Sequence, residues 1–172
     1  MPLTRITGLT TDRFHRNDQG ACLTLGQNPA LLPPSLAQLD RDGSERRRKR
    51  QLALLDSLQA DVIAFQELRG WDAGGWWRLW EAANKLEMTP LPPVLSRRGR
   101  GNHLALLYRP QTVRVVDYDA DPARRAFYHG VGRARLEIRD QPVLTVLFTH
   151  LCFLGGTERY AEAQWLTAYG DT

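Results

Sequence analysis

The stretch Asp61-Val-Ile-Ala-Phe-Gln-Glu67 decides the fold of this chain. Its four consecutive apolar residues, Val62 to Phe65, predict a strand that is buried on both faces. A Gln-Glu pair follows where the strand ends, and a carboxylate held rigidly at that position suits a metal ligand or an acid–base group. We therefore single out Glu67 as a candidate functional residue.

Periodicity on either side of this strand predicts an alternation of helices and further strands. Upstream, Leu52, Leu55 and Leu58 fall on one face of a helix that begins near Ser44. Strands are expected at 103–108, 113–118, 133–139 and 143–149, helices at 76–86 and 157–169, and one short strand around 21–25. The proline-rich stretch 90–93 leads to a basic loop at 96–101.

The strand predicted at 143–149 also ends in a side chain capable of chemistry, His150. If the two strands pack in one layer, Glu67 and His150 face the same cleft. A carboxylate is a hard oxygen ligand for Mg²⁺, and an imidazole can hydrogen-bond a phosphate oxygen. The pair therefore indicates metal-assisted hydrolysis of a phosphoester.

Length and composition are those of a globular domain. The chain has 172 residues, of which 42% are hydrophobic and 24% charged. No apolar run approaches the ~18 residues of a membrane helix, and residues 1–6 lack the apolar core of a secretory signal. We expect a cytoplasmic protein without a membrane span. Of the two cysteines, Cys152 follows an apolar strand and is expected to be buried.

Charge and aromatic residues leave two interpretations open. A net charge of +4 favours a phosphate-bearing partner, but a solvated face is the simpler interpretation of the basic runs at 46–50 and 97–100, and we expect the run at 46–50 to be exposed. Four tryptophans, Trp71, Trp76, Trp77 and Trp80, fall within ten residues. Such residues can stack on nucleic-acid bases, although helical spacing favours packing against the sheet.

Taken together, these segments resemble the endonuclease/exonuclease/phosphatase family, to which deoxyribonuclease I belongs. The resemblance rests on Asp61 to Arg69, on Leu104-Ala-Leu-Leu-Tyr-Arg-Pro110, and on Val143 to Leu151. It implies an α+β fold, a deoxyribonuclease I-like sandwich of two β-sheets flanked by helices. The family domain would occupy residues 45–172 and would follow a loop-rich segment at 1–44.

The resemblance also implies roles for three residues. Glu67 would bind Mg²⁺, with Mn²⁺ as an alternative ion, and His150 would act at the scissile phosphate. Arg69 would lie where deoxyribonuclease I-like members touch nucleic acid. The partner would be a phosphoester substrate, which in such relatives ranges from DNA and RNA to inositol phosphates and lipids.

Several family motifs are missing from the sequence. No asparagine ends an early apolar strand, and neither a Gly-Asp-x-Asn motif nor a C-terminal Ser-Asp-His motif is present. We therefore expect the N-terminal portion of the fold, incomplete at the C-terminus, with weak or no hydrolase activity. Two alternatives remain open: a non-catalytic nucleic-acid-binding module, and a non-functional fragment of the fold.

Overall fold

The computed structural model describes residues 6–7, 44–96, 98, 101–139 and 141–170. Its elements, in chain order, are β1 (Ile6–Thr7), α1 (Ser44–Ser57), β2 (Val62–Phe65), α2 (Trp77–Lys85), β3 (Thr89–Pro90), β4 (Ala105–Tyr108), β5 (Val113–Asp119), β6 (Val131–Ile138), β7 (Leu144–Thr149) and α3 (Gly156–Gly170). The short strand predicted around 21–25 lies outside the described residues.

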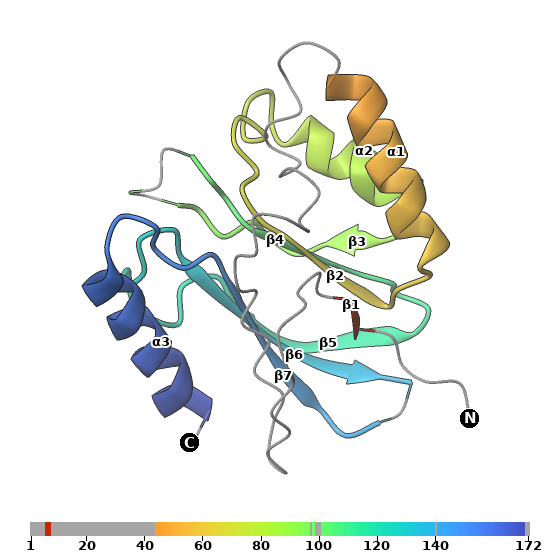
Figure 1. Ribbon diagram of the computed structural model, residues 1–172. Helices are drawn as coiled ribbons and strands as arrows, with labels where there is room; N and C mark the ends of the chain where they lie inside the picture. The colour runs from red at the N-terminus through yellow and green to blue at the C-terminus, as the bar shows by residue number, and fades with distance from the viewer. Residues whose placement is uncertain (1–5, 8–43, 97, 99–100, 140, 171–172) are drawn as a thin grey trace.

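The strands form two sheets that stack face to face. One sheet has the order β1-β2-β4-β3 and the other has the order β5-β6-β7. Neighbouring strands are antiparallel, except that β1 pairs in parallel with β2. Helices α1 and α2 cover the outer face of the first sheet, and α3 covers the outer face of the second (Figure 1). The predicted α+β sandwich of two sheets flanked by helices is confirmed.

Strand β2 is buried on both faces, as its apolar run predicts. Ile63 and Phe65 pack among residues of α1 and α2. Val62, and with it the partly buried Ala64, faces the core between the two sheets. Because successive side chains of a strand point to opposite faces, only a continuous apolar run can fill both cores.

A third core lies between the second sheet and α3. It contains Val131 of β6, Leu147 of β7 and Leu166 of α3. Strand β6 alternates as predicted, with Ala134 and Leu136 buried and Arg135 exposed. The molecule therefore has four layers: helices α1 and α2, the first sheet, the second sheet, and helix α3.

The proline-rich stretch begins in an edge strand, β3, that was not predicted from the sequence. Thr89 and Pro90 pair with Tyr108 and Leu107 of β4, and Val94 forms a further bridge with Leu104. A proline cannot donate a ladder hydrogen bond, but an edge strand needs donors on one side only. The tertiary position of β3 at the edge of its sheet is what permits proline there.

Two expectations about the surface are wrong. Arg48, expected to be exposed with the rest of its basic run, is buried and forms a 3.0 Å ion pair with Glu81 of α2. Trp77 and Trp80, expected to pack on the sheet, are 49% and 52% exposed. The inward face of α2 is instead built from Leu79 and the two alanines that follow it in the helix.

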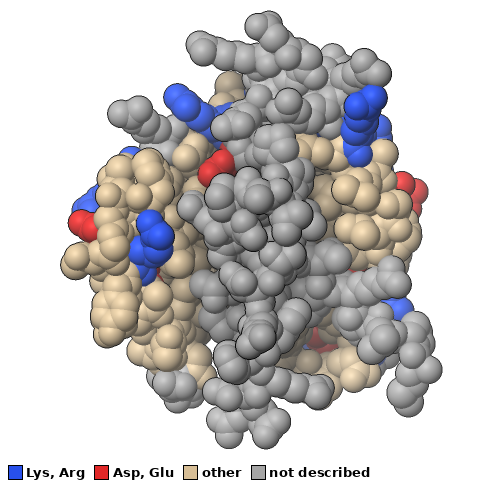
Figure 2. All heavy atoms as spheres, in the orientation of Figure 1, with Lys and Arg blue, Asp and Glu red and all other residues tan. Residues whose placement is uncertain are grey.

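The charged side chains drawn on the face in Figure 2 are scattered among uncharged residues. This face therefore shows no continuous basic surface among the described residues. None of the helices in the described ranges combines the length and the apolar character that crossing a membrane requires.

Candidate active site

Four chemically competent side chains gather at one end of the sandwich. Glu67 lies just beyond the end of β2, and His150 directly follows β7. His103 and His129 each lie two residues before the strand that follows them, β4 and β6. Strand β4 runs antiparallel to β2, and β6 runs antiparallel to β7. The starts of β4 and β6 therefore lie beside the ends of their partners.

The structure brings the two predicted residues together across the two sheets. Nε2 of His150 lies 3.5 Å from Oε1 of Glu67. The imidazole is buried, whereas the Glu67 side chain is 34% exposed. Glu67 adopts a left-handed backbone conformation with φ of 57°, which is uncommon for a residue with a side chain. The carboxylate therefore presents an open side to solvent and an inner side to His150.

A hydrogen bond between the sheets holds this pair in place. Nε2 of Gln66 donates to the carbonyl oxygen of Thr149 at 2.7 Å. These are the residues that immediately precede Glu67 and His150 in the chain. On the far side of β7, the Thr149 hydroxyl donates to the carbonyl of Gly130 at 2.7 Å. The ends of β2 and β7 are thus fixed relative to each other and to the start of β6.

His129, which the sequence did not point to, stacks on His150. The two rings lie 4.4 Å apart at an angle of 11°. Nδ1 of His129 is 3.5 Å from the Ser96 hydroxyl. Burial, together with the neighbouring His150, lowers the pKa of His129 from 6.5 to about 4. His129 is therefore neutral at pH 7, and its ring packs flat against the ring of His150 without adding charge.

Burial also decides the charge of His150. It lowers the pKa of the His150 imidazole, while the carboxylates of Glu67 and Glu162 oppose that shift. The net direction is downward, so the ring is predominantly neutral at pH 7. A neutral imidazole keeps one nitrogen as a donor and one as an acceptor.

His103 shares a hydrogen-bonding partner with His129. The backbone N–H of Ser96 donates to Nδ1 of His103 at 3.1 Å, so a neutral His103 carries its proton on Nε2. That nitrogen lies 3.7 Å from Oδ2 of Asp72. Burial lowers the pKa of His103, and Asp72 partly offsets the effect. Ser96 therefore connects two of the histidines at this end of the molecule.

A buried carboxylate from α3 anchors both loops that carry the stacked histidines. Glu162 accepts a hydrogen bond from the backbone N–H of Tyr128 at 2.7 Å through Oε1. Its Oε2 accepts another from the N–H of Cys152 at 2.6 Å. Tyr128 adjoins His129, and Cys152 lies two residues after His150. One side chain therefore fixes the spacing of two segments from different strands.

Arg69, the third predicted residue, is not part of this cluster. Its side chain is exposed and makes no ion pair or hydrogen bond with a described residue. Its backbone N–H donates to the carbonyl of Glu67 at 2.7 Å, which closes a tight turn. The predicted contact of Arg69 with substrate stays a prediction.

Sequence reasoning missed His129, Ser96 and Glu162, and nothing local in the sequence marks Ser96 or Glu162 as functional. His129 precedes a glycine just before a strand, Ser96 sits in a basic loop, and Glu162 is one of two acids on α3. A histidine next to a glycine at a strand start was the one available signal for His129. Nothing in the sequence indicates that Ser96 reaches the His129 ring or that Glu162 binds the backbone beside it.

A magnesium ion fits this site through a single carboxylate. The Glu67 carboxylate is partly exposed, and its Oε1 faces Nε2 of His150 at 3.5 Å. Within the described ranges, no group of three His, Cys, Asp or Glu side chains is close enough to chelate a metal. Mg²⁺ usually keeps several waters and takes one or two protein carboxylates. Glu67 is therefore suited to be one ligand of a largely hydrated ion.

Comparison with known proteins supports the fold. No protein-family model matches the sequence, and no curated protein matches it significantly. Among solved structures, the chain is similar to the crystal structure of ANGEL2, a 2′,3′-cyclic phosphatase, with a TM-score of 0.55 and 16% sequence identity. The match covers 72% of this chain but 37% of the ANGEL2 chain. It confirms the predicted fold class, a deoxyribonuclease I-like sandwich of two β-sheets flanked by helices.

Proposed function

We propose that this chain carries the site of a metal-dependent phosphoester hydrolase of the endonuclease/exonuclease/phosphatase type. In this proposal Glu67 binds Mg²⁺ and His150 acts at the scissile phosphate. The observation that carries the proposal is the 3.5 Å approach of Glu67 to His150, from separate sheets, at one end of the sandwich. The fold likeness to ANGEL2, a 2′,3′-cyclic phosphatase, supports the same class of reaction.

The neutral state of His150 suits such a role. A neutral imidazole can donate a hydrogen bond to a phosphate oxygen or accept a proton from water, and these tasks require a pKa near or below the working pH. Stacking on His129 fixes the plane of the ring. When bound, Mg²⁺ would polarise the phosphoryl oxygen and orient the substrate.

Glu67 and Arg69 would have different roles, the first in binding the ion and the second in binding the substrate. Glu67, at the open side of the pair, would hold the ion beside His150. The exposed Arg69, two residues along the chain, would contact the phosphates that flank the scissile bond. A guanidinium suits this contact because its planar donors match phosphate oxygens in pairs.

The test is hydrolysis of bis(p-nitrophenyl) phosphate by the full chain with Mg²⁺ or with EDTA. Because the described residues supply one carboxylate and one imidazole, we expect slow hydrolysis that needs the ion. Loss of a single positioned group of this kind costs ~10²–10⁴ in rate. The variants Glu67→Gln and His150→Asn should therefore reduce the rate to background.

A matched control is available on the surface. Glu87 shares the left-handed backbone of Glu67, with φ of 54° against 57°, and its side chain is 84% exposed. The variant Glu87→Gln should hydrolyse the substrate as the unmodified chain does. Equal activity of Glu67→Gln and Glu87→Gln would refute the role of Glu67, and activity undiminished by EDTA would refute the metal dependence.

A non-catalytic nucleic-acid-binding module is the second candidate function, and one observation favours it. Trp77 and Trp80 are half-exposed, and the guanidinium of Arg78 lies 5.3 Å from the Trp77 ring centroid. Exposed aromatic rings beside cations can stack on single-stranded bases. A gel shift that weakens steeply with salt, without cleavage, and that is lost in Trp80→Ala would favour this function over hydrolysis.

A further inference from the structure

A cavity of about 390 Å³ lies between the loops at the end of the sandwich, apart from Glu67 and His150. One side is formed by the segment that follows β3, including Pro93 and Val94, and the other by the segment that follows β5, including Ala120 and Phe127. Arg98 and Arg125 bring positive charge to the lining. The volume is within the range of ~300–1,000 Å³ that is usual for small-molecule sites.

Two contacts hold the walls of this cavity together. The hydroxyl of Tyr118 in β5 donates to the carbonyl of Pro92 at 2.5 Å, which joins the end of β5 to the segment after β3. Gly130 packs so closely on Val94 that an added Cβ would lie 2.8 Å from Cγ1 of Val94. The cavity is therefore preformed, which reduces the entropic cost of binding.

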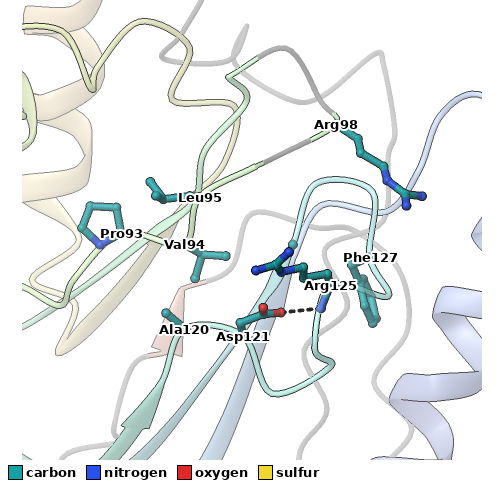
Figure 3. Close-up of a pocket in the computed structure, with 9 residues that line it drawn as sticks. Pro93, Val94, Leu95, Arg98, Ala120, Asp121, Arg125 and Phe127 are labelled. Carbon is teal, nitrogen blue, oxygen red and sulfur yellow. Dashed lines mark hydrogen bonds between the residues drawn. The ribbon is translucent and has the colours of Figure 1, made fainter.

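The charge at the cavity comes from a locked turn. Asp121 accepts a hydrogen bond from the backbone N–H of Arg125 at 2.8 Å, and both Arg124 and Arg125 have positive φ values, 48° and 72°. Two successive non-glycine residues in this region indicate a conformation maintained by its surroundings. In Figure 3 the Arg125 side chain extends across the opening toward Val94.

The charge of Arg125 is available to a ligand. No described residue forms an ion pair with its guanidinium. The lining contains two arginines and one aspartate, Asp121, so its net charge is +1. Asp121 already accepts the N–H of Arg125, and Figure 3 shows Arg98 directed along the rim, away from the opening. Arg125 is thus the cation that a bound anion would meet.

We propose that this cavity is a binding site for a small organic anion, with the apolar part of the ligand against Val94 and Ala120 and the anionic group on Arg125. The site is separate from the Glu67–His150 pair and does not depend on hydrolysis there. Its wall nevertheless includes Gly130, which adjoins His129 of the histidine stack. A phosphate and a carboxylate head group share the required chemistry.

Binding is tested by calorimetric titration of the full chain, in EDTA, with phenyl phosphate, benzoate and inorganic phosphate. We expect phenyl phosphate or benzoate, or both, to bind more tightly than inorganic phosphate, which lacks the apolar part. The tighter of the two aromatic ligands identifies the head group. Binding of inorganic phosphate alone, or of none of the three, would overturn the proposal.

Two variants and one control locate the site. Arg125→Gln should weaken binding about five- to thirtyfold, as expected for loss of a charge-assisted hydrogen bond. Arg124→Gln removes the same charge from a neighbouring exposed arginine that does not line the cavity, and should bind as the unmodified chain does. Ala120→Leu should block the apolar part while leaving the charge in place.

These measurements separate the proposal from its rivals. Equal losses in Arg124→Gln and Arg125→Gln would show that general positive charge, rather than this cavity, attracts the anion. Unchanged binding by Ala120→Leu would place the ligand elsewhere. The variant Glu67→Gln should bind the ligand normally, so a failure of the proposed hydrolase would leave this result unaffected.

Discussion

Gln66 and Thr149 are 83 residues apart in sequence, yet the side-chain amide of the first donates to the backbone carbonyl of the second at 2.7 Å. This single bond joins the two sheets at the positions from which Glu67 and His150 project. Because β2 and β7 belong to different sheets, no ladder hydrogen bond performs that task. The geometry of the candidate site therefore depends on a residue that touches neither the proposed metal nor the phosphate.

The variant Gln66→Leu should separate the ends of β2 and β7. Loss of one partly buried hydrogen bond lowers the free energy of unfolding by ~1 kcal/mol, and the Thr149 carbonyl loses its partner. We expect hydrolase activity to fall much more than stability, because a small misplacement of the pair misaligns the reacting groups. Urea unfolding and the rate assay measure the two effects.

The exposed Gln141 supplies the control for this prediction. Its replacement by leucine should change the free energy of unfolding by less than ~0.5 kcal/mol, as for most surface substitutions. A Gln66→Leu variant that is as active as Gln141→Leu would contradict the positioning role of Gln66.

Glu162 should prove essential for the arrangement of the histidine stack. The variant Glu162→Ala leaves the N–H groups of Tyr128 and Cys152 without their acceptor, which should cost ~3 kcal/mol. Glu162→Gln keeps one carbonyl oxygen as an acceptor, so the loss in the free energy of unfolding should be about half as large. Thermal unfolding gives the stability, and the ring-proton NMR signals of His129 and His150 report their environment.

A substitution on the exposed side of α3 controls for a general effect of alanine on the stability of the helix. Gln164→Ala should leave both histidine signals unchanged. If Glu162→Ala also leaves them unchanged, the anchoring role is wrong even where the variant is less stable.

Stability should fall as the pH is lowered from 6.5 toward 4. The folded-state pKa of His129 is depressed to about 4, so the unfolded chain binds its proton first and acid favours unfolding. Between pH 6.5 and 4 this contribution can reach ~3 kcal/mol, and above pH 6.5 it is fully present. The lowered pKa values of His103 and His150 act in the same direction.

Denaturant unfolding at intervals from pH 7.5 to 4.5 measures this dependence. The variant His129→Phe keeps a flat ring on His150 and removes the titrating group. Its free energy of unfolding should therefore fall less steeply with decreasing pH, by a slope that corresponds to at most one bound proton. An identical pH dependence in the variant and the unmodified chain would contradict the assignment to His129.

Gly132 should tolerate no side chain. A Cβ at this position would lie 2.3 Å from Cζ of Phe148, its cross-strand partner, and 2.8 Å from Cγ2 of Val94. Both neighbours are buried, so they cannot move aside without repacking the core between the sheets. We expect Gly132→Ala to lower the free energy of unfolding by ~1–3 kcal/mol.

The double variant Gly132→Ala/Phe148→Leu tests the cause of that loss. The double variant should lose less free energy of unfolding than the two single variants lose together, because the smaller leucine makes room for the new methyl group. Strict additivity of the two changes would show that the clash with Phe148 is not responsible.

How far the sequence alone reaches is clearest at β2. Its apolar run predicted a strand buried on both faces, because a strand can bury both faces only when successive residues are apolar. The same reasoning placed Glu67 and His150 at strand ends. Strand β3 was missed because Pro90 weakens the local signal, and a proline is tolerated only at a sheet edge that the local sequence does not reveal.

The sequence by itself determined most of the individual strands and helices and the two strand ends that carry Glu67 and His150, because periodicity and apolar runs are local properties of the chain. The sandwich of two sheets was what the family resemblance implied. Only the tertiary structure decided what surrounds Glu67 and His150. The stacking of His129 on His150, the two amides held by Glu162 and the burial of Arg48 against Glu81 all join residues from separate elements. Such contacts depend on how the sheets and helices pack against one another, and no local pattern in the sequence records that packing.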